Sequence, residues 1–130
     1  MRTVIGRFTP QVFAIMRFVT GLLFACHGSQ KLLGWPPGGQ HPPLASIFGL
    51  SGIIELVCGI LIAVGFLTGI AAFIASGEMA VAYFMVHFHQ GPIPLLNKGE
   101  LAVVYCFLWL FVAAHGAGIW SLDDVMMKKR

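Results

Sequence analysis

The chain has 130 residues, of which 58% are hydrophobic and 10% are charged, and its formal net charge is +3. Soluble domains carry about 25% charged and about 45–50% apolar residues, so this composition excludes a soluble enzyme, a disordered chain and a nucleic-acid-binding protein. It predicts an integral membrane protein formed by one domain over residues 1–130.

Four apolar segments of about 20 residues each follow one another along the chain. A helix of that length crosses a hydrocarbon core of about 30 Å and satisfies its own backbone hydrogen bonds in lipid. The apolar runs are too long, and alternate too little, to be strands. We therefore expect an all-α membrane protein, a bundle of four transmembrane helices at residues 11–33, 44–67, 68–88 and 100–119.

Glycine and proline mark the breaks between these segments. The predicted connections are a loop at residues 34–43, a tight uncharged hairpin at residues 65–69 and a loop at residues 90–98.

A short helix is expected after the fourth span. Ser121, followed three residues later by Asp124, is typical of a helix N-cap. Trp120 belongs to a residue type that is enriched at the level of the lipid headgroups. We expect a C-terminal helix that begins near Leu122 and lies along the membrane surface.

An even number of crossings places both chain ends on the same side. Basic residues gather at those ends, at Arg2, Arg7 and residues 128–130, whereas the opposite side holds only Lys98 and, near the end of the first span, Lys31. The positive-inside rule therefore predicts a multi-pass protein of the inner (plasma) membrane with both termini in the cytoplasm.

The cysteines give no sign of a metal or disulfide site. Cys26, Cys58 and Cys106 lie in separate apolar segments, with no zinc-type spacing to one another or to histidine. His87 and His89 are two residues apart, so on a helix they point to different sides and do not share a metal. We predict neither a disulfide nor a bound metal.

Ionisable residues inside the predicted spans are the candidate site residues, because each costs a few kcal/mol in lipid and faces a partner or a cavity. On the first helix, Arg17, Gly21, Gly28 and Lys31 fall on one stripe, and His27 lies beside it. The glycines on that stripe allow a neighbouring helix to approach closely.

The second and third predicted helices each carry one acidic residue in an apolar span. On the second helix, Glu55 lies between the small residues Gly52 and Gly59. On the third, four residues share one face: Glu78, Ala82, Met85 and His89.

Depth in the bilayer separates these residues into two groups. Glu55 and Glu78 each lie about 14 Å from the start of their helix, so we expect a central cluster in which Arg17 pairs with one of them. That pair would either fix helix packing alone or form part of a site. We expect an outer cluster of His27, Lys31, His89, Lys98 and Glu100.

Four segments resemble the DoxX family of membrane proteins. They are the F-x-x-H-G-x-x-K motif at residues 24–31, E-x-x-x-G-x-x-L-x-x-G at 55–65, N-x-G-E-x-A at 97–102 and G-x-G-x-W-S-L-D at 116–123. The resemblance covers about residues 13–124. It implies a four-helix integral membrane protein, and some relatives are subunits of a thiosulfate:quinone oxidoreductase or belong to membrane redox complexes. The positions that carry over are Arg17, His27, Lys31, Glu55 and Glu100.

Three functions are compatible with these features. The first is a redox-associated subunit of a membrane oxidoreductase that binds a quinone-like molecule. His27 and Lys31 would contact a quinone carbonyl, while Arg17, Glu55 and Glu78 would tune charge or pass protons. The second is a non-catalytic accessory subunit of a larger electron-transfer complex in the membrane. The third is a small-molecule transporter or scaffold. The expected partners are the lipid bilayer and other membrane subunits, and no nucleic acid.

Overall fold

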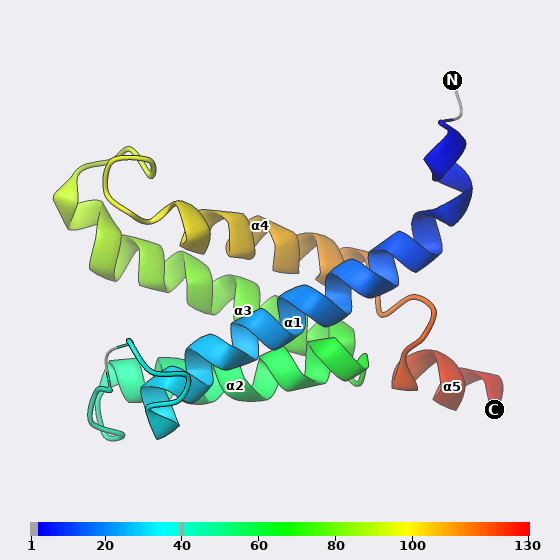
Figure 1. Ribbon diagram of the computed structural model, residues 1–130, viewed down its shortest axis with the longest axis horizontal. Coiled ribbons are helices and arrows are strands. Elements are labelled where there is room, and N and C mark those ends of the chain that lie inside the picture. Colours follow the sequence, from blue (N-terminus) through cyan, green and yellow to red (C-terminus); the bar gives the residue numbers. More distant parts are fainter. Residues whose placement is uncertain (1–2, 40) are drawn as a thin grey trace.

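The computed structural model describes residues 3–39 and 41–130. Arg2, which contributes to the charge pattern, and Gln40, in the predicted first loop, lie outside the described residues. Within those two ranges every regular element is helical (Figure 1). After a short helix at Val4–Phe8 come α1 (Thr9–Leu33), α2 (Ile47–Val64), α3 (Thr68–Ala82), α4 (Glu100–His115) and α5 (Leu122–Lys128).

Three helical stretches of the described chain are long and apolar enough to cross a membrane, namely Val4–Leu33, Ile47–Val64 and Thr68–Gln90. The fourth apolar helix, α4, has 16 residues. It ends at His115 and not near residue 119 as predicted, because Gly116 takes a positive φ of 86° that breaks the helix.

Glycines set the close packing of α1 on α2, as the stripe on the first helix predicts. A Cβ on Gly21 would lie 2.7 Å from the backbone nitrogen of Ala63, and a Cβ on Gly59 would lie 2.5 Å from that of Ala25. A Cβ on Gly28 would collide with the backbone of Leu56. Backbone therefore meets backbone along this helix pair, which leaves no room for a side chain in between.

The helices form two hairpins, α1 with α2 and α3 with α4, which diverge toward the ends that carry the loops after α1 and α3 (Figure 1). Where the hairpins meet, the core is fully buried and includes Phe24, Ile62, Trp109 and Val112. Phe24 joins the two hairpins, because its ring packs against Tyr105 and Trp109 on α4. The site described below includes residues near both diverging ends, such as Lys31 and Phe48 of one hairpin and His87 and Lys98 of the other.

Arg17 does not pair with Glu55 or Glu78, so the predicted central cluster is wrong. Its buried guanidinium donates to the carbonyl oxygens of Ile62 and Ala63 at 2.7 and 2.8 Å, and to that of Trp120 at 2.8 Å. The last four carbonyls of a helix have no partner within the helix, so the end of α2 offers acceptors that the sequence pattern does not reveal. Arg17 thus fastens the segment before α5 to the end of α2.

Asp123 completes this junction. Its carboxylate accepts hydrogen bonds from the backbone amides of Leu67 and Thr68 at 2.9 and 3.0 Å, and so caps the start of α3. Its own amide donates to the carbonyl of Gly65 at 2.8 Å. The α5 helix itself begins after Ser121, whose hydroxyl accepts from the amide of Asp124 as the N-cap pattern predicts.

The third helix changes form before it ends. It is α-helical to Ala82, a π-helix over Tyr83–His87 and a 3-10 turn over Phe88–Gln90. A π-turn inserts about one extra residue, which rotates everything after it relative to an ideal α-helix. The predicted shared face therefore holds for Glu78, Ala82 and Met85, but His87 joins them at the cavity described below and His89 does not.

Candidate functional site

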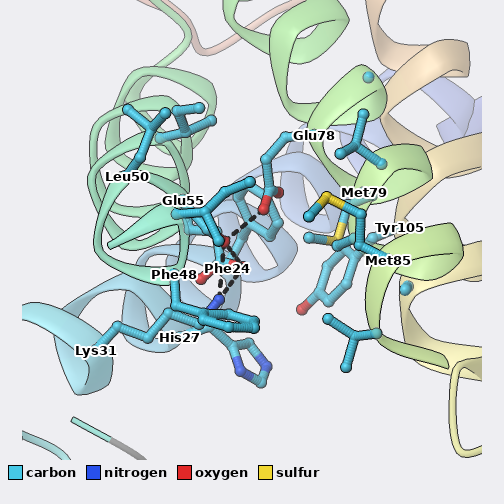
Figure 2. Close-up of a pocket in the computed structure, with 18 of the residues that line it drawn as sticks. Phe24, His27, Lys31, Phe48, Leu50, Glu55, Glu78, Met79, Met85 and Tyr105 are labelled. Carbon is cyan, nitrogen blue, oxygen red and sulfur yellow. Dashed lines mark hydrogen bonds and ion pairs between the residues drawn. The ribbon is translucent and has the colours of Figure 1, made fainter. Parts of the chain in front are cut away.

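A cavity of about 610 Å³ lies between the two hairpins, and all four long helices contribute to its wall. Most of the lining is apolar, with Phe48 and Ile54 from α2, and Met79 and Met85 from the third helix. Figure 2 shows the polar side chains of α1, α2 and α3 gathered in its interior. An apolar chamber with a few convergent polar groups is the usual form of a site for a small molecule.

Lys31 and Glu55 form the charged centre of the site. The Nζ of Lys31, on the last turn of α1, lies 2.8 Å from Oε1 of Glu55 on α2 and 2.9 Å from Oγ of Ser51. The Glu55 side chain is 4% exposed and that of Lys31 is 27% exposed. The carboxylate is therefore buried with its counter-charge beside it, whereas the ammonium still reaches the cavity.

Ser51 links this ion pair to the third helix. Its hydroxyl donates to Oε1 of Glu78 at 2.5 Å and accepts from Lys31. Glu55 and Ser51 are four residues apart on α2, so both side chains lie on one face toward α3. The second carboxylate oxygens of Glu55 and Glu78 are buried, and neither has a hydrogen-bond partner among the described residues. The network therefore retains spare capacity to accept hydrogen bonds.

His27 and Tyr105 both line the cavity. Their rings meet edge to face with centroids 6.2 Å apart. His27 is one turn before Lys31 on α1, and Tyr105 projects from α4 with its hydroxyl toward the α1–α2 side (Figure 2). Both side chains carry a group that can donate a hydrogen bond to a ligand held next to Lys31.

The wall opposite α1 and α2 is fixed by a buried amide. Asn97 is fully buried, and its side chain donates to the hydroxyl of Tyr83 at 3.0 Å and to the carbonyl of Gly91 at 2.8 Å. Its side-chain oxygen accepts from the amide of Gly99 at 2.9 Å. The carbonyl of the same residue lies 3.1 Å from Nδ1 of His87, which lines the cavity. These bonds hold the π-helical turn in place.

Four of the six predicted site residues line this one cavity, and they are His27, Lys31, Glu55 and Glu78. Arg17 and Glu100 do not: Arg17 lies at the α2–α5 junction, and Glu100 is exposed at the first turn of α4. The separation into a central and an outer cluster is also wrong, because Lys31 from the outer group binds Glu55 from the central group.

Sequence reasoning missed four polar residues of the site, and one of them, His87, reaches the cavity wall in the π-turn. The signal for Ser51 was its spacing of four residues before Glu55, which places both on one helical face. Tyr105 had no signal beyond its position in an apolar helix. Asn97 was recognised within the N-x-G-E-x-A segment, but nothing in that pattern shows that it is buried and holds the π-turn.

Comparisons with known proteins identify relatives over most of the chain. The sequence profile of the DoxX family matches residues 12–88. An uncharacterised protein of Haemophilus influenzae is 38% identical over 95% of this chain and 96% of its own length. An uncharacterised membrane protein of Mycobacterium tuberculosis is 28% identical over 92% of this chain and 83% of its own length. No solved structure matches the chain.

Proposed function

This chain belongs to the DoxX family of membrane proteins, and we propose that it crosses the inner membrane four times and binds a quinone headgroup between its two hairpins. The observation that carries the proposal is the Lys31 ammonium, which reaches a largely apolar cavity while Glu55 balances its charge.

The length of α4 is compatible with a fourth crossing. Its 16 residues extend about 24 Å, a few ångströms less than a typical hydrocarbon core, and local thinning of the bilayer accommodates such a difference at modest cost. With four crossings, Arg7 and the basic residues 128–130 lie on one side, which the positive-inside rule places in the cytoplasm. The α5 helix then lies along the cytoplasmic surface.

Labelling of single cysteines tests this topology. A membrane-impermeant maleimide applied to intact cells should label a cysteine at exposed Leu95, in the loop before α4, but not one at Lys128, with the native cysteines replaced by alanine. Labelling of both positions, or of Lys128 alone, would contradict four crossings with a cytoplasmic C-terminus.

A quinone headgroup matches the chemistry of the cavity. A quinone is an apolar ring with two carbonyl oxygens, which accept hydrogen bonds. Lys31, His27 and Tyr105 are the donors near one end of the cavity, and a charged donor forms the stronger kind of hydrogen bond. The apolar walls from α2 and α3 would hold the ring and its tail. Glu78, joined to Lys31 through Ser51, would exchange protons with the site.

The proposal includes an electron-transfer partner in the same membrane. A bound quinone changes its redox state only by exchanging electrons with a donor or an acceptor. We therefore propose that the chain acts as the quinone-binding subunit of a membrane redox complex. Purification of the tagged chain from its native membrane in a mild detergent should retain a redox subunit, and recovery of the chain alone would contradict this part of the proposal.

Tryptophan fluorescence provides the binding test. Trp109 is buried and stacks on Tyr105, with ring centroids 5.6 Å apart. Because Tyr105 lines the cavity, Trp109 lies directly behind the cavity wall. Replacing the exposed Trp35 and Trp120 by phenylalanine leaves Trp109 as the only reporter. A short-chain quinone should then quench it in a saturable way.

The matched variant is Lys31→Met, which keeps the length of the side chain but removes the donor. It should weaken quinone binding about tenfold or more, as expected for loss of a charged hydrogen bond. A Lys98→Met variant is the control for loss of a positive charge, because Lys98 lies on the opposite, exposed rim of the cavity. Equal quinone affinity in wild type and in Lys31→Met would remove the ammonium from the site.

A further inference from the structure

His87 has one ring nitrogen whose role is fixed by its surroundings. Its Nδ1 lies 3.1 Å from the carbonyl oxygen of Asn97, and a carbonyl only accepts hydrogen bonds, so Nδ1 must carry the proton. In the neutral ring the other nitrogen, Nε2, is then unprotonated and accepts hydrogen bonds. No side chain or backbone group among the described residues bonds to Nε2.

The surrounding hydrogen bonds also fix the position of the His87 ring. Asn97 is fully buried, and its amide is held by Tyr83, Gly91 and Gly99, so its carbonyl has one orientation. The π-turn over Tyr83–His87 then brings His87 to the cavity wall in place of His89. Single π-turns in helices occur frequently at functional sites.

The cavity wall therefore carries two chemically different groups, one from each hairpin. Lys31, on α1, is a permanent donor, whereas His87, on the third helix, presents an acceptor. An oxidised quinone has only acceptor oxygens, so it can accept from Lys31 but cannot bond to the unprotonated Nε2 of His87. A hydroquinone satisfies both, because one hydroxyl oxygen accepts from Lys31 while the other hydroxyl donates to His87.

We propose that His87 contacts the ligand through Nε2 and makes the site selective for the hydroquinone form. This inference rests on the proposed quinone site and specifies which redox state that site holds more tightly. The second carboxylate oxygens of Glu55 and Glu78 are also acceptors, but they are buried. Lys98, which also lines the cavity, carries a donor, so it does not substitute for His87 as an acceptor.

The test compares three probes that share one ring system: menadione, its hydroquinone menadiol, and menadiol dimethyl ether, which has the hydroquinone shape without its hydroxyl donors. Binding is measured by equilibrium dialysis under nitrogen with the full chain in lipid nanodiscs, and the signal of empty nanodiscs is subtracted. Wild type should bind menadiol about fivefold more tightly than menadione, the effect of one added neutral hydrogen bond. The dimethyl ether should show no such preference.

Two histidine variants distinguish the loss of a ligand contact from a general disturbance of the fold. His87→Ala should lose the preference for menadiol and keep the affinity for menadione, which serves as the internal control for a folded site. His89→Ala removes a histidine from the 3-10 turn that follows, outside the cavity lining, and should keep the wild-type preference.

Each other outcome has a distinct meaning. If wild type binds menadiol and menadione equally, or if His87→Ala weakens both to the same extent, the role of His87 is overturned and the quinone site stands. If wild type binds none of the probes, the inference falls together with the proposed function.

Discussion

Lys31 and Glu55 join the last turn of α1 to the middle of α2 through an ion pair of 2.8 Å. The carboxylate is almost fully buried, while the ammonium is partly open to the cavity. The pair therefore serves two purposes, because it neutralises a charge inside the helix bundle and positions a donor for a ligand. Its first purpose can be tested without any ligand.

Removing one member of this pair should destabilise the protein more than removing both. Lys31→Met leaves the Glu55 carboxylate buried without a counter-charge, and such a change costs about 3–5 kcal/mol in buried pairs. The double variant Lys31→Met/Glu55→Met should recover most of that loss. The measurement is the free energy of unfolding of all four forms in mixed micelles, and additive losses in the two single variants would show that the residues do not interact.

Close packing of α1 on α2 depends on the absence of a side chain at position 28. Gly28→Ala places a methyl group against the backbone of Leu56, and overpacking of this kind costs about 1–3 kcal/mol. Gly77→Ala is the matched control on α3, because its methyl group meets open space and alanine is the better helix former by about 0.5–1 kcal/mol. Thermal unfolding should separate the two variants, and equal melting temperatures would contradict the described packing.

Asp123 should make stability depend on pH in the acid range. Partial burial raises the pKa of this carboxyl, but hydrogen bonds from the amides of Thr68 and Leu67 and the charge of Arg17 outweigh burial and lower the pKa below 3.8. A group with a lowered pKa in the folded state contributes stability above its unfolded pKa and loses it as pH falls through the folded value.

The corresponding variant is Asp123→Asn, which removes the charged cap of α3. At neutral pH it should cost about 1–2 kcal/mol, because the asparagine amide offers one neutral acceptor oxygen where the carboxylate offers two charged ones, and the difference from wild type should shrink as pH falls below 3.8. Asp124→Asn is the control, because Asp124 forms only an exposed pair with Lys128 and should cost less than 1 kcal/mol. A difference that stays constant from neutral to acid pH would show that the Asp123 charge makes no contribution.

Arg17 should control how firmly the C-terminal segment is attached. Arg17→Lys keeps the charge, but a single ammonium cannot reach the carbonyls of Ile62, Ala63 and Trp120 together as the planar guanidinium does. We expect faster hydrogen exchange at residues 119–125 in this variant, with exchange in α4 unchanged. Protection equal to wild type in both regions would mean that Arg17 does not hold this junction.

Much of the helical arrangement follows from local patterns. The apolar runs predict α1, α2 and the helical stretch Thr68–Gln90 to within a few residues, and the glycine stripe predicts which face of α1 meets α2. These features are predictable because they depend on residues one or two helical turns apart. The end of α4 was overestimated, since apolar residues continue past the glycine that stops the helix.

The site was only partly predictable, for a physical reason. Depth counted along each helix places Arg17 near the glutamates, but the free carbonyls at the end of α2 and the return of the chain at Trp120 create acceptors that no side-chain pattern shows. The π-turn likewise replaces His89 by His87 at the cavity. Both errors come from backbone geometry, which side-chain periodicity assumes to be regular.

Photolabelling measures the location of a bound quinone most directly. An azidoquinone activated in nanodiscs containing the full chain should attach to residues of the cavity wall, such as Phe48 and Ile54, and excess unlabelled quinone should prevent that labelling. Lys31→Met should reduce it in parallel. Labels confined to outward-facing residues such as Ile70 and Phe73, unaffected by competitor, would place the quinone in the surrounding lipid and contradict a site between the hairpins.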